Sequence, residues 1–168
     1  MTVEHPGLDP NQDIMNKYVS MVLDHLQPST KLVIVGLSLG GVYAPRVAGM
    51  LNQHQEWEDT AIDVFMLDSP GLLDSVFSSK AALSSLRHPY LTFNYVGATK
   101  GGFGSDETVK AQWQATFPGG KMYEVKCGHT DLWSEVGCEQ TAKIMEESMR
   151  PTEDAMVKLV SSLRRHQG

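Results

Sequence analysis

The sequence predicts an α/β fold, with a mostly parallel sheet of about four strands and helices on both faces. The chain has 168 residues, of which 41% are hydrophobic and 20% charged, so it is long enough for one domain with a real core. Apolar, strand-like runs alternate along it with segments of helical periodicity. The predicted strands are 31–35, 61–67, 90–96 and 121–125. We therefore expect a single domain over residues 1–168, beginning with a loop segment at residues 1–10.

The first predicted helix covers residues 13–26, where apolar side chains recur at three- and four-residue steps. Further helices are predicted at 42–53, 108–116, 142–149 and 153–165, with one or two short ones at 72–86. Residues 98–105 are rich in glycine and are predicted to form a loop. In a parallel sheet of this kind ligands bind at the carboxyl ends of the strands, so the residues that follow each strand are the candidates for a site.

Composition excludes several classes of protein. The net charge of −6 and the lack of a basic stripe argue against a nucleic-acid-binding surface. No apolar stretch approaches the roughly 20 residues that span a bilayer, and no signal segment is visible at the N-terminus, so we expect a cytoplasmic protein. Cys127 and Cys138 are expected to remain reduced thiols. No cofactor is expected, and no metal either, because Cys127 and His129 alone do not make a zinc site.

The most informative motif is GLSLGG at residues 36–41, which directly follows the apolar strand at 31–35. Strand, G-x-S-x-G and helix in this order predict a nucleophile elbow, with Ser38 on a sharp turn at the start of the helix. The glycines on either side, Gly36 and Gly40, are expected to prevent crowding of that turn. The alternative is a glycine-rich turn that packs tightly or binds a phosphate.

Two further polar residues follow predicted strands. Asp68 comes directly after the strand at 61–67, and His129 follows the strand at 121–125. Ser38, Asp68 and His129 thus occur in the chain order nucleophile, acid, base. A histidine can take the proton of a serine hydroxyl, and a carboxylate can orient the imidazole. Asp68 could instead cap a turn, and Asp106 in the glycine-rich loop is the alternative acid.

Four motifs in order resemble the thioesterase domains of polyketide synthase and nonribosomal peptide synthetase type, which are α/β-hydrolases. They are HPG at 5–7, VGLSLGG at 35–41, LDSP at 67–70 and CGH at 127–129, and they cover most of the chain. The resemblance implies that Ser38 forms an acyl-enzyme and that the N–H of Leu39 is an oxyanion donor. It also implies an acyl thioester substrate, carried by an acyl or peptidyl carrier protein.

The chain departs from that family in two respects. HPG lies well inside those domains but at residue 5 here, so the resemblance implies that the leading strands and their oxyanion donor are absent. The segment between Pro70 and Tyr90 is short for the helical lid, which implies an open, shallow site. Without leading strands, the strand at 31–35 would have a bare edge. We expect that edge to pair in a homodimer, to be covered by a companion segment, or to be avoided by a rearranged strand order.

The function predicted is hydrolysis or transfer of an acyl group from a carrier-bound thioester, through Ser38, His129 and Asp68. A carboxylesterase acting on small esters remains open within the same chemistry. The same scaffold could instead serve a cyclase or isomerase, or a binding module whose triad no longer acts. Apolar residues that could line a pocket, though such residues are more often core, are Val76, Phe77, Phe103, Trp113 and Trp133.

Overall fold

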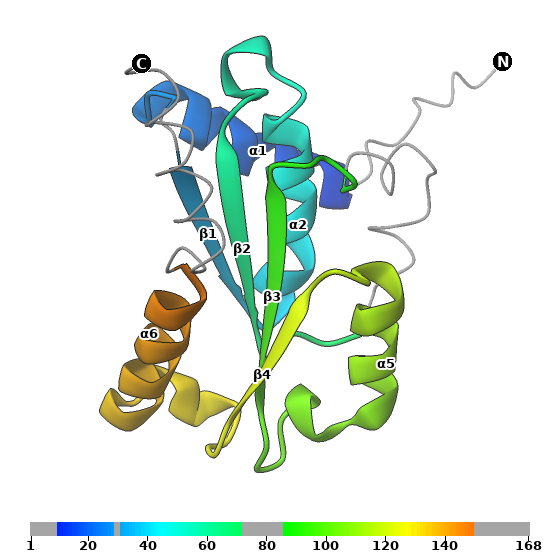
Figure 1. The fold of residues 1–168 in the computed structure, drawn as a ribbon, viewed down its shortest axis with the longest axis vertical. Coiled ribbons are helices and arrows are strands. Elements are labelled where there is room, and N and C mark those ends of the chain that lie inside the picture. Colours follow the sequence, from blue (N-terminus) through cyan, green and yellow to red (C-terminus); the bar gives the residue numbers. More distant parts are fainter. Residues whose placement is uncertain (1–9, 29–30, 72–85, 150–168) are drawn as a thin grey trace, which may run out of the picture.

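A computed structural model describes residues 10–28, 31–71 and 86–149 of the chain. These residues form a four-stranded parallel sheet in the order β1-β2-β3-β4 (Figure 1). The strands are β1 (Lys31–Leu37), β2 (Ala61–Leu67), β3 (Leu91–Ala98) and β4 (Lys121–Val125). The α-helices are α1 (Pro10–His25), α2 (Leu39–Leu51), α5 (Glu107–Thr116) and α6 (Glu135–Met149), and short 3₁₀ turns are η1 (Gln55–Trp57), η2 (Phe103–Ser105) and η3 (Thr130–Trp133). The predicted fold class is confirmed.

Helices cover both faces of the sheet, as Figure 1 shows with α2 and α5 on one side and α6 on the other. Each strand alternates its side chains between these faces, which produces two apolar clusters. The larger cluster joins α1, α2 and α5 to the sheet, and its fully buried members include Val42, Leu51 and Val64. The smaller cluster lies under α6 and η3 and contains Phe65 and Val96.

The predicted elements agree with the structure best where the hydrophobic pattern is strong. The strands at 61–67 and 121–125 have the predicted bounds. β1 runs two residues further than predicted, to Leu37, and α2 begins at once at Leu39. Residue 10, assigned to the N-terminal loop, is the first residue of α1, a position that proline tolerates because its missing N–H is not needed there. The predicted helix at 153–165 and residues 72–85 of the predicted helical segment 72–86 lie outside the described part, and Leu86 itself lies in a turn.

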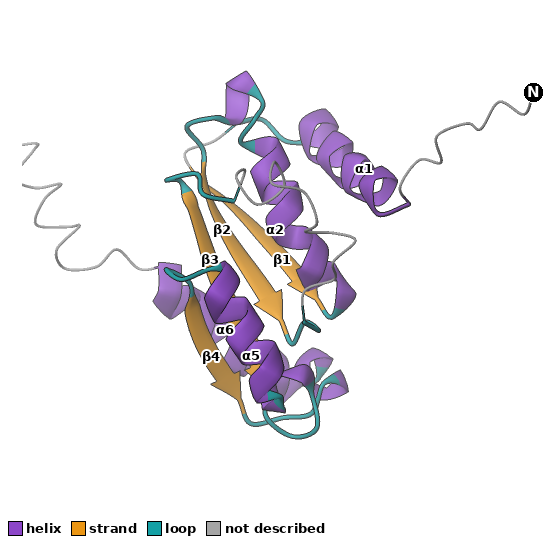
Figure 2. Cartoon of the chain, turned by 90° about the vertical axis from the view of Figure 1, so that its right-hand side faces the viewer, coloured by secondary structure: helices purple, strands orange, loops and turns teal. Residues whose placement is uncertain are grey.

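All four strands point the same way, so their carboxyl ends form a common rim (Figure 2). The register aligns them closely, because Leu37 pairs with Leu67 and Leu67 pairs with Val96. Backbone hydrogen bonds continue one residue past the strands, from Ser38 N to Leu67 O at 2.9 Å and from Asp68 N to Val96 O at 2.7 Å. The first residues after β1 and β2 are therefore held side by side at the rim.

Among the described residues, β1 pairs with β2 alone, so its other edge is bare in the sheet. Val35, in the middle of the strand, is 48% exposed, whereas Phe65 beside it on β2 is fully buried. The strand order is not rearranged to protect this edge. Pairing of the edge with a second copy or a companion segment stays a prediction.

The two cysteines lie in different surroundings. Cys127 is 8% exposed in the smaller apolar cluster, and its burial, followed by the charges of Asp131 and Asp68, raises the pKa of its thiol. Cys138 is exposed on α6. Because the thiolate is the reactive form, iodoacetamide at pH 8 should alkylate Cys138 first and Cys127 more slowly, on the order of tenfold. Peptide mass spectrometry over time measures both rates, and Cys138→Ser should leave the protein almost unlabelled at early times. Equal rates at the two cysteines would contradict the buried position of Cys127.

Candidate active site

Ser38 occupies a strained turn between β1 and α2. Its backbone φ is 52° and ψ is −125°, a conformation that residues with side chains rarely adopt. It stands at the N-cap position of α2, yet its side chain makes no capping hydrogen bond, although serine caps helices readily. The hydroxyl is therefore not occupied by the helix that follows it. Strain of this kind costs energy and tends to persist where function requires it.

Two glycines allow the strand and the helix to approach each other at this turn. A Cβ on Gly36 would overlap the carbonyl oxygen of Gly40, and a Cβ on Gly41 would overlap the Ser69 hydroxyl. A Cβ on Gly40 would meet nothing within 4 Å. The expectation that Gly40 prevents crowding was wrong, because its missing side chain would point into open space. The tight pair is Gly36 and Gly41.

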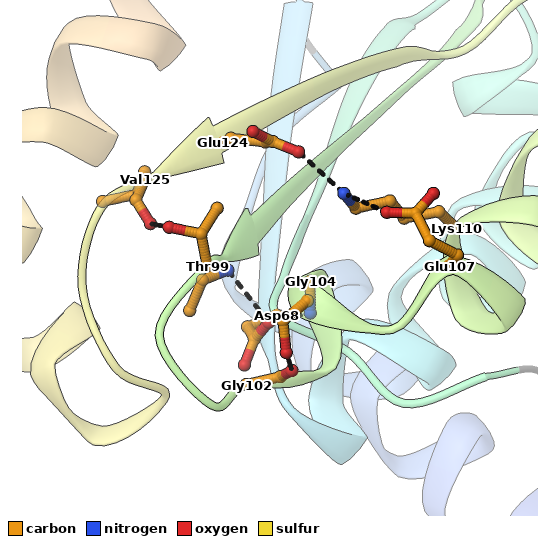
Figure 3. A network of polar contacts seen from close by, with 10 residues as sticks. Asp68, Thr99, Gly102, Gly104, Glu107, Lys110, Glu124 and Val125 are labelled. Carbon is orange, nitrogen blue, oxygen red and sulfur yellow. Dashed lines mark hydrogen bonds and ion pairs between the residues drawn. The ribbon is translucent and has the colours of Figure 1, made fainter.

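Asp68 is the other non-glycine residue with positive φ in the described part of the chain, at 40°. Its side chain is fully buried and reaches across to the loop after β3. Oδ1 accepts hydrogen bonds from Ala98 N at 2.9 Å and Gly104 N at 2.6 Å, and Oδ2 accepts one from Phe103 N at 3.2 Å. Figure 3 shows Asp68 close to Gly102 and Gly104 in this loop. The carboxylate thus does not cap its own turn.

His129 lies against the same carboxylate. Its Nδ1 is 2.5 Å from Asp68 Oδ2, and its side chain is 30% exposed. A carboxylate can only accept, so Nδ1 carries the proton of this hydrogen bond, and Nε2 of the neutral ring is left with a free lone pair. This is the tautomer that a general base needs.

The loop that carries His129 is held by Asp131. Gly128 N donates to Asp131 Oδ2 at 3.0 Å, and Asp131 N donates to Gly128 O at 3.1 Å. Further along, Ser134 donates from both its N–H and its hydroxyl to Asp131 O. Asp131 therefore closes a compact turn that fixes the backbone on either side of His129. This role was not predicted from the sequence, because aspartate is favoured at the first position of such a turn and here it stands at the last.

Asp106, the alternative acid, has another partner. It is exposed, caps α5 and accepts a hydrogen bond from Thr108 N at 2.8 Å. It lines an open surface depression of about 470 Å³ together with His129 and the loop residues Gly101, Gly102, Phe103 and Ser105. The geometry therefore pairs His129 with Asp68, whereas Asp106 lies at the edge of the surface depression and caps α5.

Two groups near the site, Tyr95 and Lys110, have raised pKa values. Burial, and then the charges of Asp68 and Asp106, raise the pKa of Tyr95, whose neutral hydroxyl donates to Ser69 O at 3.0 Å. Lys110 lies between Glu107 and Glu124 at 2.9 and 2.7 Å (Figure 3), and the hydrogen bonds to Glu124 and then Glu107 raise its pKa. Within the described residues no group of three or more His, Cys, Asp or Glu side chains could hold a metal ion.

The remaining predicted site residues are placed as follows. Leu39 is 46% exposed and is the first residue of α2, a position whose N–H has no partner within the helix. Of the apolar pocket candidates, Trp113 is buried in the core, Trp133 is 69% exposed and Phe103 contacts the His129 ring. Val76 and Phe77 lie outside the described residues.

The parallel sheet with helices on both faces is an α/β-hydrolase-like fold, and comparison with a solved structure agrees. The chain is similar to the NocB thioesterase domain, solved in covalent complex with a fluorophosphonate nocardicin G analogue. The TM-score is 0.57 at 14% sequence identity, over 88% of this chain and 78% of that one. The fold is therefore thioesterase-like.

Sequence comparisons add less. A model of the family described as Mbeg1-like matches residues 7–88, a stretch that contains Ser38 and Asp68 but ends before His129. No curated protein matches the sequence. No helix in the described part of the chain is both long and apolar enough to cross a membrane.

Proposed function

We propose that this protein is a serine hydrolase of thioesterase type, with Ser38 as nucleophile, His129 as general base and Asp68 as the acid that orients it. The observation that carries the proposal is the buried Asp68 paired with His129 at the rim where Ser38 occupies its strained turn. Nothing in folding alone requires a buried carboxylate to hold an imidazole at the rim where an uncapped serine follows β1.

The proposed reaction proceeds in two halves. Ser38 Oγ attacks the acyl carbonyl carbon while His129 Nε2 takes the hydroxyl proton, and the oxyanion that forms accepts a hydrogen bond from Leu39 N. The carbon–sulfur bond then breaks, and the imidazolium returns its proton to the departing thiolate. Water, or a nucleophile within the acyl group, attacks the acyl-enzyme in the same way and releases an acid or a ring.

The substrate class we propose is an acyl thioester, with a carrier protein as the donor of the acyl group. Support comes from the likeness in fold to a thioesterase domain. The open depression beside His129 favours a second candidate, a carboxylesterase acting on small esters, because such substrates need no enclosed chamber. Comparing kcat/KM for an N-acetylcysteamine thioester and a p-nitrophenyl ester of the same acyl group, each divided by the rate constant of its uncatalysed hydrolysis, separates the two. A preference for the oxygen ester would favour the carboxylesterase.

Labelling with a fluorophosphonate, followed by intact-mass measurement, tests the proposal directly. We expect one adduct on the wild type, none on Ser38→Ala, and labelling slowed by about 10³-fold or more in His129→Ala, because the hydroxyl is then no longer activated. Ser20→Ala is the control, since this serine is exposed on α1 and its loss should leave the adduct in place. A folded wild type that takes no label would contradict the hydrolase and favour a cyclase, an isomerase or a binding module.

A further inference from the structure

The aromatic ring of Phe103, in η2, packs against the imidazole ring of His129. Its centroid lies 5.5 Å from that of the His129 ring, and the two rings are nearly perpendicular, at 88°. Phe103 also donates its backbone N–H to Asp68 Oδ2, the oxygen that His129 Nδ1 contacts. One residue thus contacts both members of the pair, the carboxylate through its backbone and the imidazole through its ring.

A hydrogen bond at Nδ1 does not by itself fix an imidazole. The χ2 torsion of histidine has a broad energy minimum, so the ring can rock about its contact with Asp68 while that contact is kept. A flat ring standing perpendicular to the imidazole limits this rocking through van der Waals contact, and edge-to-face aromatic pairs are attractive in this geometry. The contact therefore restricts the direction in which Nε2 points.

Phe103 is itself placed by its two neighbours. A Cβ on Gly102 would overlap Asp68 Oδ2, and a Cβ on Gly104 would overlap the backbone of Gly97. Because these neighbours are glycines, the loop packs directly on Asp68 and β3, and the Phe103 ring lies against the His129 ring. The turn is closed by Asp106 N donating to Phe103 O at 3.0 Å and by Ser105 Oγ donating to Gly102 O at 2.6 Å. The Phe103 ring is thus attached to a backbone segment whose N–H groups are hydrogen-bonded to Asp68.

We propose that Phe103 is a positioning residue that holds the His129 imidazole in its catalytic orientation; as a statement about catalysis this rests on the proposed hydrolase function. Its ring is 38% exposed and lines the depression together with His129. In the competing role, Phe103 only lines the depression as its wall, contacts the acyl group of the substrate and does not orient His129. The two roles differ in the kinetic constant that they affect, because a misdirected base lowers kcat whereas a lost contact that is equal in ground and transition states raises KM.

The test uses Phe103→Leu, which keeps an apolar side chain but removes the flat ring, and Phe103→Tyr, which keeps the ring. With an N-acetylcysteamine thioester as substrate, we expect kcat to fall by about tenfold to a hundredfold in Phe103→Leu while KM stays within about twofold. Small misplacements of a catalytic group cost rates of this order. Phe103→Tyr should restore kcat to within about threefold of the wild type. A raised KM with unchanged kcat in Phe103→Leu would overturn the proposal in favour of the wall.

A matched control exists at the other end of β3. His88 and Tyr90 form a ring pair with the same 5.5 Å separation, far from the carboxyl-end rim, and Tyr90 is 44% exposed. Tyr90→Leu removes an equivalent aromatic contact to a histidine and should leave kcat unchanged. A similar loss of kcat in Tyr90→Leu would mean that the effect of Phe103→Leu is a general loss of stability, which would overturn the positioning role.

A spectroscopic readout keeps this inference separate from the proposed function. The readout is the Nδ1 proton of His129, which Asp68 Oδ2 accepts and which should exchange slowly with water in the wild type. Its exchange should quicken in Phe103→Leu, because a rocking ring weakens this hydrogen bond, and stay slow in Phe103→Tyr, as measured by NMR of ¹⁵N-histidine-labelled protein. An Nδ1 proton that exchanges as slowly in Phe103→Leu as in the wild type would overturn the positioning role, whatever the outcome of fluorophosphonate labelling.

Discussion

Replacing Asp68 with asparagine is expected to lower kcat by about 10⁴-fold while leaving substrate binding nearly intact. The reason lies in the proton pattern around Oδ2. In the wild type this oxygen accepts from Phe103 N at 3.2 Å and is paired with His129 Nδ1. An amide nitrogen in its place would donate to His129 Nδ1, which moves the imidazole proton to Nε2. A ring protonated at Nε2 cannot take the proton of Ser38.

Rotating the side-chain amide by 180° would not restore activity in Asp68→Asn without a cost in stability. The nitrogen would then replace Oδ1 and face the N–H groups of Ala98 and Gly104, which donate at 2.9 and 2.6 Å. Two buried donors would lose their acceptor, at about 1–3 kcal/mol each. We therefore expect the first orientation, with a lower thermal midpoint from the opposed Phe103 N–H as a secondary effect.

The measurement is kcat and KM for a model thioester, with circular dichroism melting curves to show that the variant is folded. Asp106→Asn is the matched control. It makes the same chemical change in the alternative acid, and asparagine caps helices as well as aspartate does, so α5 should keep its cap. Full activity in Asp68→Asn together with a large loss in Asp106→Asn would mean that Asp106, and not Asp68, is the acid that orients His129.

Much of this site could be predicted from sequence because the register of a parallel sheet aligns the strand ends. Once 31–35 and 61–67 are recognised as neighbouring strands, the residues that follow them must lie at one rim, and this places Ser38 beside Asp68. The fold class follows from the same alternation of strand and helix. These features depend on backbone geometry, which the hydrophobic pattern determines strongly.

Side-chain partners depend on loop conformation, and that was not predictable from the pattern. Asp68 and Asp106 are both carboxylates near the rim, and only the path of residues 98–105 decides between them. That loop turns its N–H groups of Phe103 and Gly104 onto Asp68, while Asp106 is carried on to the start of α5. The same limit explains the error over Gly40, since a glycine motif does not reveal which missing Cβ faces a neighbour.

The elbow glycines are expected to respond to alanine with opposite signs. In Gly36→Ala the new Cβ would overlap the Gly40 carbonyl and lie 2.6 Å from Gly41 N, and both are backbone atoms that cannot turn aside. Either β1 or α2 must shift, so we expect a loss of at least about 3 kcal/mol of stability, the upper end for overpacking. Ser38 sits between these elements, so labelling by the fluorophosphonate should fall with it.

Gly40→Ala is expected to do the reverse. The site is open, Gly40 lies in the first turn of α2, and alanine is favoured over glycine inside helices by up to about 1 kcal/mol. Urea unfolding should therefore give a higher midpoint than wild type for Gly40→Ala and a much lower one for Gly36→Ala. Equal destabilisation of both variants would mean that the turn is tight around Gly40 as well, and that Ser38 is held in a different conformation from the one described. A lower midpoint in Gly36→Ala with unchanged labelling would instead separate the packing of the turn from the activation of the serine.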